Sequence, residues 1–346
     1  MHEAKVLVVD DSAAMRALFS DVLDQAKNVR VVGAAANADD ARRQIAELKP
    51  NVLTLDVEMP GMSGIEFLAE IMGSAPMPVV MLSSLTQAGT ETSLKAYDLG
   101  AVECFPKPLK ATPEQFAKTV GKLGKIVLAA ANSNVRDRQA HHARRTAEAA
   151  AAPAFAWNGH IVAMSASLGG IDALSAVLAA YPANCPPTVI VLNAEPVVVE
   201  AFVGRLGQEA GFSARLAKDG AQLTQGIVHI ASDPARHVVF EVGQPPRLRL
   251  LDREPVEGAR PSANLLYGTM ARAGVPALGV VLTGMGEDGA KGLKLLRDSG
   301  SDTIAQDPAS ATFGETPAAA IAAGGAGQVV GLDRLAAAVL AACSMS

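Results

Sequence analysis

Five polar residues in the first third of the chain are of the types that one phosphoryl-transfer site requires. The acidic pair Asp10 and Asp11 follows the apolar run VLVV, and Asp56, Ser83 and Lys107 lie at or just after the ends of later apolar runs. Short runs of this kind, alternating with helical patterns, predict a parallel β-sheet. Because the carboxyl ends of parallel strands converge on one crevice, we expect the five side chains to meet there.

These side chains have complementary chemistry. Crowded carboxylates repel one another unless a cation joins them, and hard oxygen ligands suit Mg²⁺, so Asp10, Asp11 and Asp56 are predicted metal ligands. Asp56 would then accept a phosphoryl group as a carboxylate nucleophile, and Ser83 and Lys107 would contact the transferred oxygens. The alternative is that each aspartate caps a helix and that Lys107 is a solvated loop residue.

Length and composition set the class of protein. The chain has 346 residues, more than one ordinary core accommodates, so two domains are expected. Hydrophobic residues make up 49% and charged residues 19%, which is typical of a globular protein. A net charge of −5 argues against nucleic acid or an anionic membrane as the main partner.

No segment predicts export or membrane insertion. The N-terminus MHEAKVLVVDD has no basic segment followed by a long apolar run, and no later stretch reaches ~20 uncharged apolar residues. Cys104, Cys185 and Cys343 show no paired spacing, so we expect reduced thiols. These features predict a cytoplasmic protein.

Strand-like runs and helical patterns alternate over the first 128 residues. The clearest helix follows Ser12, a predicted N-cap, and its apolar residues share one face. They are Met15, Leu18, Phe19, Val22 and Leu23. This alternation predicts a doubly wound α/β domain over residues 1–128. Residues 129–156 mix alanine, polar residues and opposite charges without a strand signal, and we interpret them as a linker.

A second α/β domain is predicted over residues 157–346. The runs HIVAM, TVIVL and ALGVVLTG are typical of buried parallel strands, each followed by a turn and a helical pattern. GIVHIA, HVVFEV and RLRLLD alternate over short lengths, which predicts antiparallel strands or a hairpin on the sheet edge. We therefore expect a three-layer αβα domain with a β-hairpin insertion.

Ser167 follows HIVAM at a glycine-rich turn, and an amphipathic helix comes next. A strand-to-helix turn of this kind exposes a hydroxyl and aims helix N–H groups at an oxyanion, so Ser167 is a candidate nucleophile. Asp288, in LTGMGEDGAKG, also lies beyond a strand and could face it. A plain N-cap serine is the alternative for Ser167.

The segment LTGMGEDGAKG permits a second interpretation. Gly284, Gly286 and Gly289 fit the GxGxxG pattern of dinucleotide-binding sites, with Asp302 or Asp307 at a plausible later distance. That pattern normally lies in the first βαβ unit of a domain, whereas here it lies in a late one. A nucleotide-dependent function therefore stays an alternative.

Several motifs resemble those of known families. VLVVDDS, LTLDVEMPGMSGIEFL, PVVMLSSLT and FPKP resemble a response-regulator receiver of flavodoxin-like fold. ASLGG, RPSANLLY and LTGMGEDGAKG resemble the effector domain of the chemotaxis protein-glutamate methylesterases, the CheB family. The likeness covers nearly all of both predicted domains and excludes the linker.

The resemblance implies roles for the receiver residues. Asp56 would be the phosphoacceptor, and together with Asp10 and Asp11 it would bind Mg²⁺. Ser83 and Lys107 would contact the phosphoryl group. A chemotaxis-type histidine kinase would be the phosphodonor.

In the effector, the resemblance makes Ser167 the esterase nucleophile and Asp288 the triad acid. Leu168 and Met285 would lie around the oxyanion, and no cofactor is implied. The substrates would be glutamyl methyl esters on chemoreceptor cytoplasmic domains, with glutamine deamidation as a possible second activity. The unphosphorylated receiver is expected to cover the effector cleft.

The chain departs from the family pattern at the base. The family's histidine lies in a Gln-His-Met-Pro segment after the second effector strand, and Ala194 occupies its position here. Without a base, a serine hydroxyl is a poor nucleophile at neutral pH. Glu195, His229 and His237 are the candidates for a substitute base. Other departures are Leu168 for threonine, Asn264 for aspartate and Cys104 for an aromatic residue.

Two functions therefore remain open from the resemblance. The first is phosphorylation-controlled hydrolysis of glutamyl methyl esters by an intact methylesterase. The second is a catalytically impaired effector that acts as a phosphorylation-controlled binding module on receptors or on the kinase. Ala194 favours the second function.

Overall fold

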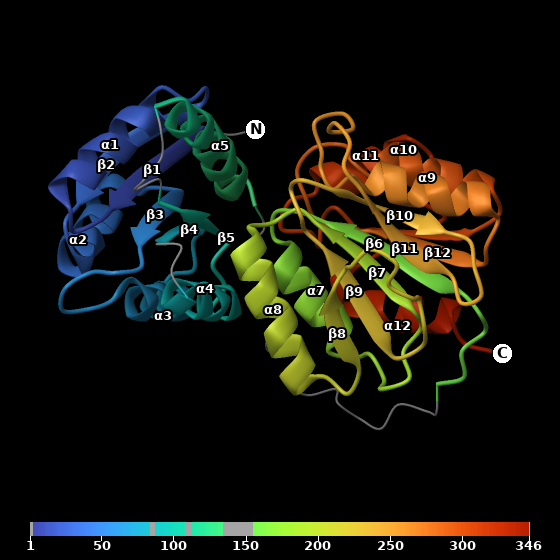
Figure 1. The fold of residues 1–346 in the computed structure, drawn as a ribbon. Coiled ribbons are helices and arrows are strands. Elements are labelled where there is room, and N and C mark those ends of the chain that lie inside the picture. The colour runs from blue at the N-terminus through green and yellow to red at the C-terminus, as the bar shows by residue number, and fades with distance from the viewer. Residues whose placement is uncertain (1–2, 84–86, 108–112, 134–154, 346) are drawn as a thin grey trace. The chain divides into compact units, whose positions relative to one another are not determined.

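The chain divides into two compact units in the computed structural model, Met1–Gln139 and Ala140–Ser346 (Figure 1). The structure describes residues 3–83, 87–107, 113–133 and 155–345. Most of the predicted linker lies outside these ranges. Helix α5 (Pro113–Ala131) continues past the domain end predicted at residue 128. Among the described helices, none is long and apolar enough to cross a membrane.

The first unit contains a five-stranded parallel sheet with the order β2-β1-β3-β4-β5. Its strands are β1 (Ala4–Val9), β2 (Val29–Ala35), β3 (Val52–Asp56), β4 (Val79–Ser83) and β5 (Glu103–Pro106). Besides α5, its helices are α1 (Ala13–Asp24), α2 (Ala38–Leu48), α3 (Gly64–Ser74) and α4 (Gln87–Asp98). Helices α1 and α5 contact one another on one face of the sheet, and α3 and α4 contact one another on the other (Figure 1).

Local sequence signals explain where these helices begin. The Ser12 hydroxyl caps α1 by accepting the Met15 N–H at 3.4 Å, and Phe19, Val22 and Leu23 of that helix are buried. Ser63 and Glu66 form a reciprocal capping box at the start of α3, which satisfies two N–H groups that a helix end otherwise leaves open. The predicted N-cap and the apolar face of the first helix are thus confirmed.

The second unit contains a seven-stranded parallel sheet with the order β14-β13-β12-β6-β7-β9-β8. The first four strands along the chain are β6 (Ile161–Ala166), β7 (Thr188–Leu192), β8 (Ser213–Leu216) and β9 (Ile227–Ala231). The last three are β12 (Ala277–Val281), β13 (Asp302–Gln306) and β14 (Gln328–Val330). A separate antiparallel pair is formed by β10 (His237–Glu241) and β11 (Arg247–Leu251).

Helices cover both faces of this sheet (Figure 1). They are α7 (Gly170–Leu178), α8 (Pro196–Glu209), α9 (Ala263–Ala273), α10 (Ala290–Asp298), α11 (Glu315–Ala322) and α12 (Leu332–Ala342). Helix α7 contacts α12 on one face, and α10 contacts α9 and α11 on the other. The three-layer α/β arrangement with a β-hairpin insertion is therefore confirmed.

One strand differs from the sequence-based expectation. GIVHIA was expected to belong to an antiparallel pair or hairpin, but β9 lies inside the main sheet and runs parallel to β7 and β8. Four of its five residues are buried, which is typical of an interior parallel strand. The hairpin consists of β10 and β11 alone, and β10 packs against α9 through a core that includes Val238 and Phe240.

All three cysteines are free and buried, as the sequence predicted for reduced thiols. Burial raises the pKa of the Cys185 and Cys343 thiols to about 12. Burial, with the nearby Glu103, also raises the pKa of Cys104. These thiols are therefore protonated at neutral pH and act as small apolar groups in the core.

Candidate functional site

The sheet of the first unit reverses direction between β1 and β3. The chain moves from β1 outward to β2, and then returns to add β3, β4 and β5 on the other side. Asp10 follows β1 directly, and Asp56 is the last residue of β3. In open α/β sheets ligands bind beyond the carboxyl ends of the strands at such a switch point, so the topology itself brings these two aspartates together.

The five predicted residues of this site are not equally buried. Asp10, Asp11 and Asp56 each offer a carboxylate oxygen within 4.8 Å of the other two. Asp10 and Asp56 are buried, whereas Asp11 is exposed. Ser83 is 5% exposed at the end of β4, and its carbonyl accepts the Lys107 N–H at 2.8 Å. The structure therefore brings together the residues that the strand-end argument selected.

Lys107 bridges the two buried carboxylates. Its Nζ lies 2.9 Å from Asp10 Oδ2 and 2.7 Å from Asp56 Oδ1. Burial raises the pKa of Asp56, and the hydrogen bond from Lys107 opposes that shift. Burial acts to lower the pKa of Lys107, but the hydrogen bonds that it donates to Asp10 and Asp56 outweigh this effect and raise that pKa. The lysine is thus charged at neutral pH.

The oxygen cluster fits a hard divalent cation. Its three ligand residues are carboxylates, the donors that Mg²⁺ prefers, and exposed Asp11 gives the cluster an open side for water and a phosphate oxygen. The loop after Asp56 is packed closely against this site. A Cβ on Gly64 would lie 1.8 Å from the Asp56 carbonyl oxygen, so only glycine allows α3 to begin there.

Cys104, which replaces an aromatic residue in the family pattern, belongs to a buried polar group beside this site. Its thiol donates to the Ser93 carbonyl at 3.6 Å, and its N–H donates to the Tyr97 hydroxyl at 3.2 Å. Tyr97 in turn donates to the Glu103 carboxylate. Helix α4 and strand β5 are therefore joined by side-chain hydrogen bonds at this position.

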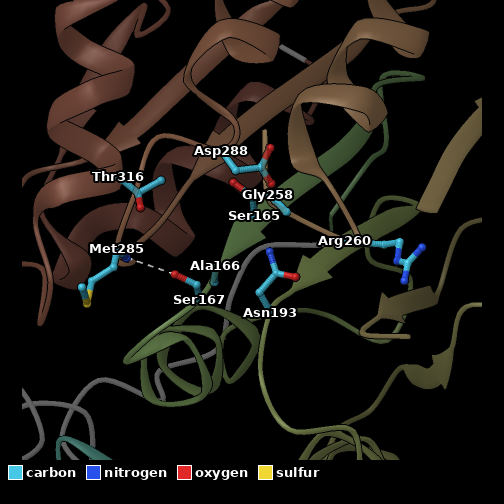
Figure 2. Close-up of a pocket in the computed structure, with 10 residues that line it drawn as sticks. Ser165, Ala166, Ser167, Asn193, Gly258, Arg260, Met285, Asp288 and Thr316 are labelled. Atoms are coloured by element: carbon cyan, nitrogen blue, oxygen red, sulfur yellow. Dashed lines mark hydrogen bonds between the residues drawn. The ribbon is translucent and has the colours of Figure 1, made fainter. Parts of the chain in front are cut away.

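The second unit has a switch point of the same kind between β6 and β12. From β6 the chain adds β7 on one side, and β12 later returns to the other side of β6. Ser167 follows β6 directly, and the segment from Thr283 to Asp288 follows β12. Ser167, Met285 and Asp288 therefore line one pocket of about 290 Å³ (Figure 2).

Ser167 is held by the loop after β12. The Met285 N–H donates to Ser167 Oγ at 3.1 Å, and the Thr283 carbonyl accepts the Ser167 N–H at 3.1 Å (Figure 2). A Cβ on Gly284 would lie 2.4 Å from Ser167 Oγ, so the serine uses the space that this glycine leaves open. The Thr283 hydroxyl donates to the Leu168 carbonyl at 3.0 Å and fixes the next residue of the turn.

Asp288 is used as a helix cap. Its carboxylate accepts the Ser262 hydroxyl at 2.7 Å, the Ala263 N–H at 2.7 Å and the Asn264 N–H at 3.1 Å, all at the start of α9. Asn264 reciprocates, because its Oδ1 accepts the N–H of Gly289 at 3.0 Å and of Gly292 at 2.7 Å at the start of α10. Each of the two helices is thus capped by a side chain from the other.

None of the three candidate substitute bases lines the pocket. His237 lies on β10, where Nδ1 accepts the Ser262 N–H at 3.2 Å and Nε2 donates to the Glu254 carbonyl at 3.0 Å, so both ring nitrogens are engaged. His229 lies on β9 with Nε2 3.1 Å from the Gln222 carbonyl. Burial lowers the pKa of His229. Glu195 is the N-cap residue of α8.

Two of the three glycines that fit the GxGxxG pattern after β12 are packed against protein, whereas Gly286 has open space beside it. The open space above Gly284 contains the Ser167 hydroxyl, and a Cβ on Gly289 would lie 3.1 Å from Ser165 Oγ. Dinucleotide sites instead leave such glycines open to a pyrophosphate. These contacts favour the serine site over the nucleotide interpretation.

Sequence reasoning missed several residues of the pocket. The Asn193 side chain points into it, and Gly258, Ala259 and Arg260 form part of its wall (Figure 2). Thr316 of α11 is 7% exposed, and its hydroxyl has no hydrogen-bond partner among the described residues. These residues come from two loops and from α11, which are far apart in sequence, so the motif spacing held no signal for them.

Comparisons with known proteins agree with this geometry. Residues 162–339 match the family of the CheB methylesterase, and residues 6–119 match the response regulator receiver domain. The Caulobacter vibrioides protein named protein-glutamate methylesterase/protein-glutamine glutaminase 1 is 42% identical over 343 residues, 98% of each chain. An Agrobacterium fabrum protein of the same name, without the number, is 45% identical over 88% of this chain and 86% of its own.

A solved structure gives the same result for the second unit. The CheB methylesterase catalytic domain of Thermotoga maritima is 25% identical, covers 53% of this chain and 98% of its own, and has a TM-score of 0.50. The matched regions together span both units described above. The chain therefore belongs to the CheB methylesterase family, as a chemotaxis response regulator in which a receiver domain precedes the methylesterase domain.

Proposed function

We propose that this chain is a phosphorylation-controlled effector that binds glutamate-bearing segments of chemoreceptors in the Ser167 pocket and hydrolyses their methyl esters very slowly. The observation that carries the proposal is the hydrogen bonding of the Ser167 hydroxyl. Its Oγ accepts the Met285 N–H, and no acceptor for its own proton lies within hydrogen-bond distance in the described part of the chain. Ala194 stands where the family has its base.

The receiver supports control by phosphorylation. Asp56 would attack the phosphorus of a phosphohistidine on a chemotaxis-type histidine kinase, forming an O–P bond as the N–P bond breaks. Asp10, Asp11 and Asp56 would hold Mg²⁺, which supplies positive charge for the phosphoryl oxygens. Lys107 already contacts Asp56 at 2.7 Å and would pair with a phosphoryl oxygen there. For these reactions we expect a cytoplasmic location.

The missing base determines how slow ester hydrolysis is expected to be. Removing the serine or the histidine of a comparable triad lowers the rate about 10⁶-fold, which corresponds to ~8 kcal/mol of barrier. About 10³- to 10⁴-fold catalysis over water survives in such variants through oxyanion stabilisation and binding. The Met285 N–H beside Ser167 is a donor of that kind. Slow turnover with retained binding is therefore the expected behaviour.

Methylester hydrolysis at a full rate is the competing function. It is favoured by Ser167 and Asp288 lining one pocket, and it requires a base that reaches the serine. The same requirement applies to glutamine deamidation, because both reactions begin with attack by the hydroxyl.

Methanol release from methylated chemoreceptors tests the proposal. The full chain with Mg²⁺ and beryllofluoride is compared with Ala194→His, and Ser167→Ala gives the background. We expect Ala194→His to exceed wild type by at least about 10²-fold, the lower range of general-base catalysis. Equal rates for wild type and Ala194→His would show that the chain has its own base. Receptor binding by Ser167→Ala, measured by co-sedimentation, should equal that of wild type.

A further inference from the structure

The pocket beside Ser167 has room for a base that the described part of the chain does not supply. Its volume is about 290 Å³, whereas a water molecule takes up about 30 Å³ of liquid, so a small ring fits with space to spare. Three lining residues, Ala166, Gly258 and Ala259, have no side chain beyond Cβ. Of the histidines in the described ranges, which are His160, His229 and His237, none lines this pocket.

The Ser167 hydroxyl is oriented to give up its proton into the pocket. Its Oγ accepts the Met285 N–H at 3.1 Å, so the O–H bond points away from that amide. The same amide would donate to a carbonyl oxygen that becomes negative during attack. Among the described residues Ser167 therefore has no proton acceptor, while its orientation and its oxyanion donor are in place.

Asp288 keeps one acceptor position for a ring N–H. An ionised carboxylate has about four lone-pair positions, and hydrogen bonds from Ser262, Ala263 and Asn264 use three of them. Oδ1 accepts two of these bonds, whereas Oδ2 accepts only the Ala263 N–H. The free position on Oδ2 suits the N–H of a neutral imidazole, whose other nitrogen is then an acceptor.

We infer that this pocket takes up an imidazole-class base from outside and uses it to hydrolyse glutamyl methyl esters. The inference rests on the proposed function, because it requires that the chain lack its own base. Imidazole would donate one N–H to Asp288 and take the Ser167 proton on its other nitrogen while the Oγ–carbon bond forms. The imidazolium returns that proton to the departing methoxide, and methanol leaves. The same ring then takes a proton from the water that hydrolyses the acyl-serine, and Ser167 recovers its proton.

The test is methanol release by the full chain, with Mg²⁺ and beryllofluoride, as imidazole is added. General acid–base catalysis contributes about 10²- to 10⁴-fold, and we expect a rise of about 10²-fold because a captured base is held less firmly than a covalent one. The rise should saturate, and it should increase with pH through the range near neutrality, where imidazolium loses its proton. A rate that is unchanged, or that rises linearly without saturation, would overturn the inference.

Two controls separate a captured base from a general effect of the additive. Pyrazole has nearly the same shape as imidazole but is a much weaker base, so it should not increase the rate. Ser167→Ala should not respond to imidazole, since the proton to be removed is absent. Equal stimulation by pyrazole, or stimulation of Ser167→Ala, would contradict the mechanism.

A second readout needs no receptor. Phenylmethanesulfonyl fluoride forms a sulfonyl ester with an activated serine and releases fluoride, and mass spectrometry of the intact chain counts the modified molecules. We expect imidazole to accelerate labelling at Ser167 by about 10²-fold, in the range of general-base catalysis, and pyrazole to leave it unchanged. Labelling of Ser167 that is indifferent to imidazole would also overturn the inference.

The base can come from solution or from a bound segment, and two methylated peptides distinguish these sources. One peptide carries a histidine near the esterified glutamate, and the other carries alanine in its place. Turnover of the histidine peptide alone, without added imidazole, assigns the base to the bound segment, whereas a response of both peptides to imidazole assigns it to solution. If neither peptide is hydrolysed under either condition, the inference fails while slow wild-type turnover still stands. If wild type without imidazole hydrolyses the esters as fast as Ala194→His does, the chain has its own base. In that case the proposed function is itself wrong.

Discussion

Replacing Asp288 should affect folding more strongly than the loss of a triad acid suggests. The Asp288 carboxylate accepts two N–H groups and one hydroxyl at the start of α9, and all three contacts are 3.1 Å or shorter. A lost N-cap costs about 0.5–2 kcal/mol, and donors left without a partner add about 1–3 kcal/mol. We therefore expect Asp288→Ala to lower the free energy of unfolding of the methylesterase domain by about 3 kcal/mol.

Asp288→Asn should recover little of this stability. An asparagine has one acceptor oxygen, and its amide nitrogen would face either the Ala263 N–H or the Ser262 and Asn264 donors. The assay is thermal unfolding followed by the fluorescence of Trp157, the single tryptophan of the chain, whose ring N–H donates to the His160 carbonyl in the same domain. For a domain of this size, ~3 kcal/mol corresponds to a fall in Tm of about 6–12 °C.

Asp298→Ala is the matched control. Asp298 is at the other end of α10 and forms an exposed ion pair with Lys294, which contributes less than about 1 kcal/mol. Its replacement should shift Tm by at most a few degrees. If Asp288→Ala unfolds at the same temperature as Asp298→Ala, the carboxylate does not hold α9, and the assignment of Asp288 as a structural cap is wrong.

Three further outcomes follow from the structure. Gly284→Ala should abolish the imidazole-stimulated sulfonyl fluoride labelling of Ser167 because the new Cβ would lie 2.4 Å from Ser167 Oγ, and mass spectrometry of the intact chain checks this. Burial lowers the pKa of His229, so below about pH 6.5 the unfolded state binds a proton that the folded state does not. The free energy of unfolding should therefore fall as pH decreases below that value, and it should fall less in His229→Gln. Measuring Tm against pH checks this. Mg²⁺ should raise the Tm of the receiver, and Asp11→Asn, an exposed change, should weaken that effect without unfolding the domain. An unchanged response to Mg²⁺ in Asp11→Asn would remove Asp11 from the ligand set.

The receiver site could be predicted because its geometry follows from local signals. Each strand is a short apolar run, and the carboxyl ends of parallel strands share one edge, so the sequence alone predicts that Asp10, Asp56 and Lys107 lie together, as they do. The position of Ser167 followed for the same reason. The fold class of both domains was predicted correctly on this basis.

Features set by contacts between distant segments could not be predicted. GIVHIA alternates like a hairpin strand, but β9 pairs with β7 and β8 along its two edges and four of its five residues are buried. Tertiary packing therefore decided its place. The cap that Asp288 gives to α9 joins it to Ala263, which lies 25 residues earlier in the chain. Thr316 reaches the pocket only because α11 follows a loop that passes Gly284.

The paired caps of α9 and α10 bear on how such chains evolve. Asp288 caps α9 and Asn264 caps α10, so a change at either residue should cost stability whether or not the reaction continues. The presence of Asp288 therefore says little about turnover, whereas Ala194 bears directly on the proposed loss of the base. Genome surveys that infer hydrolysis from a serine and an aspartate alone will count binding proteins as enzymes, and position 194 is the one to inspect first.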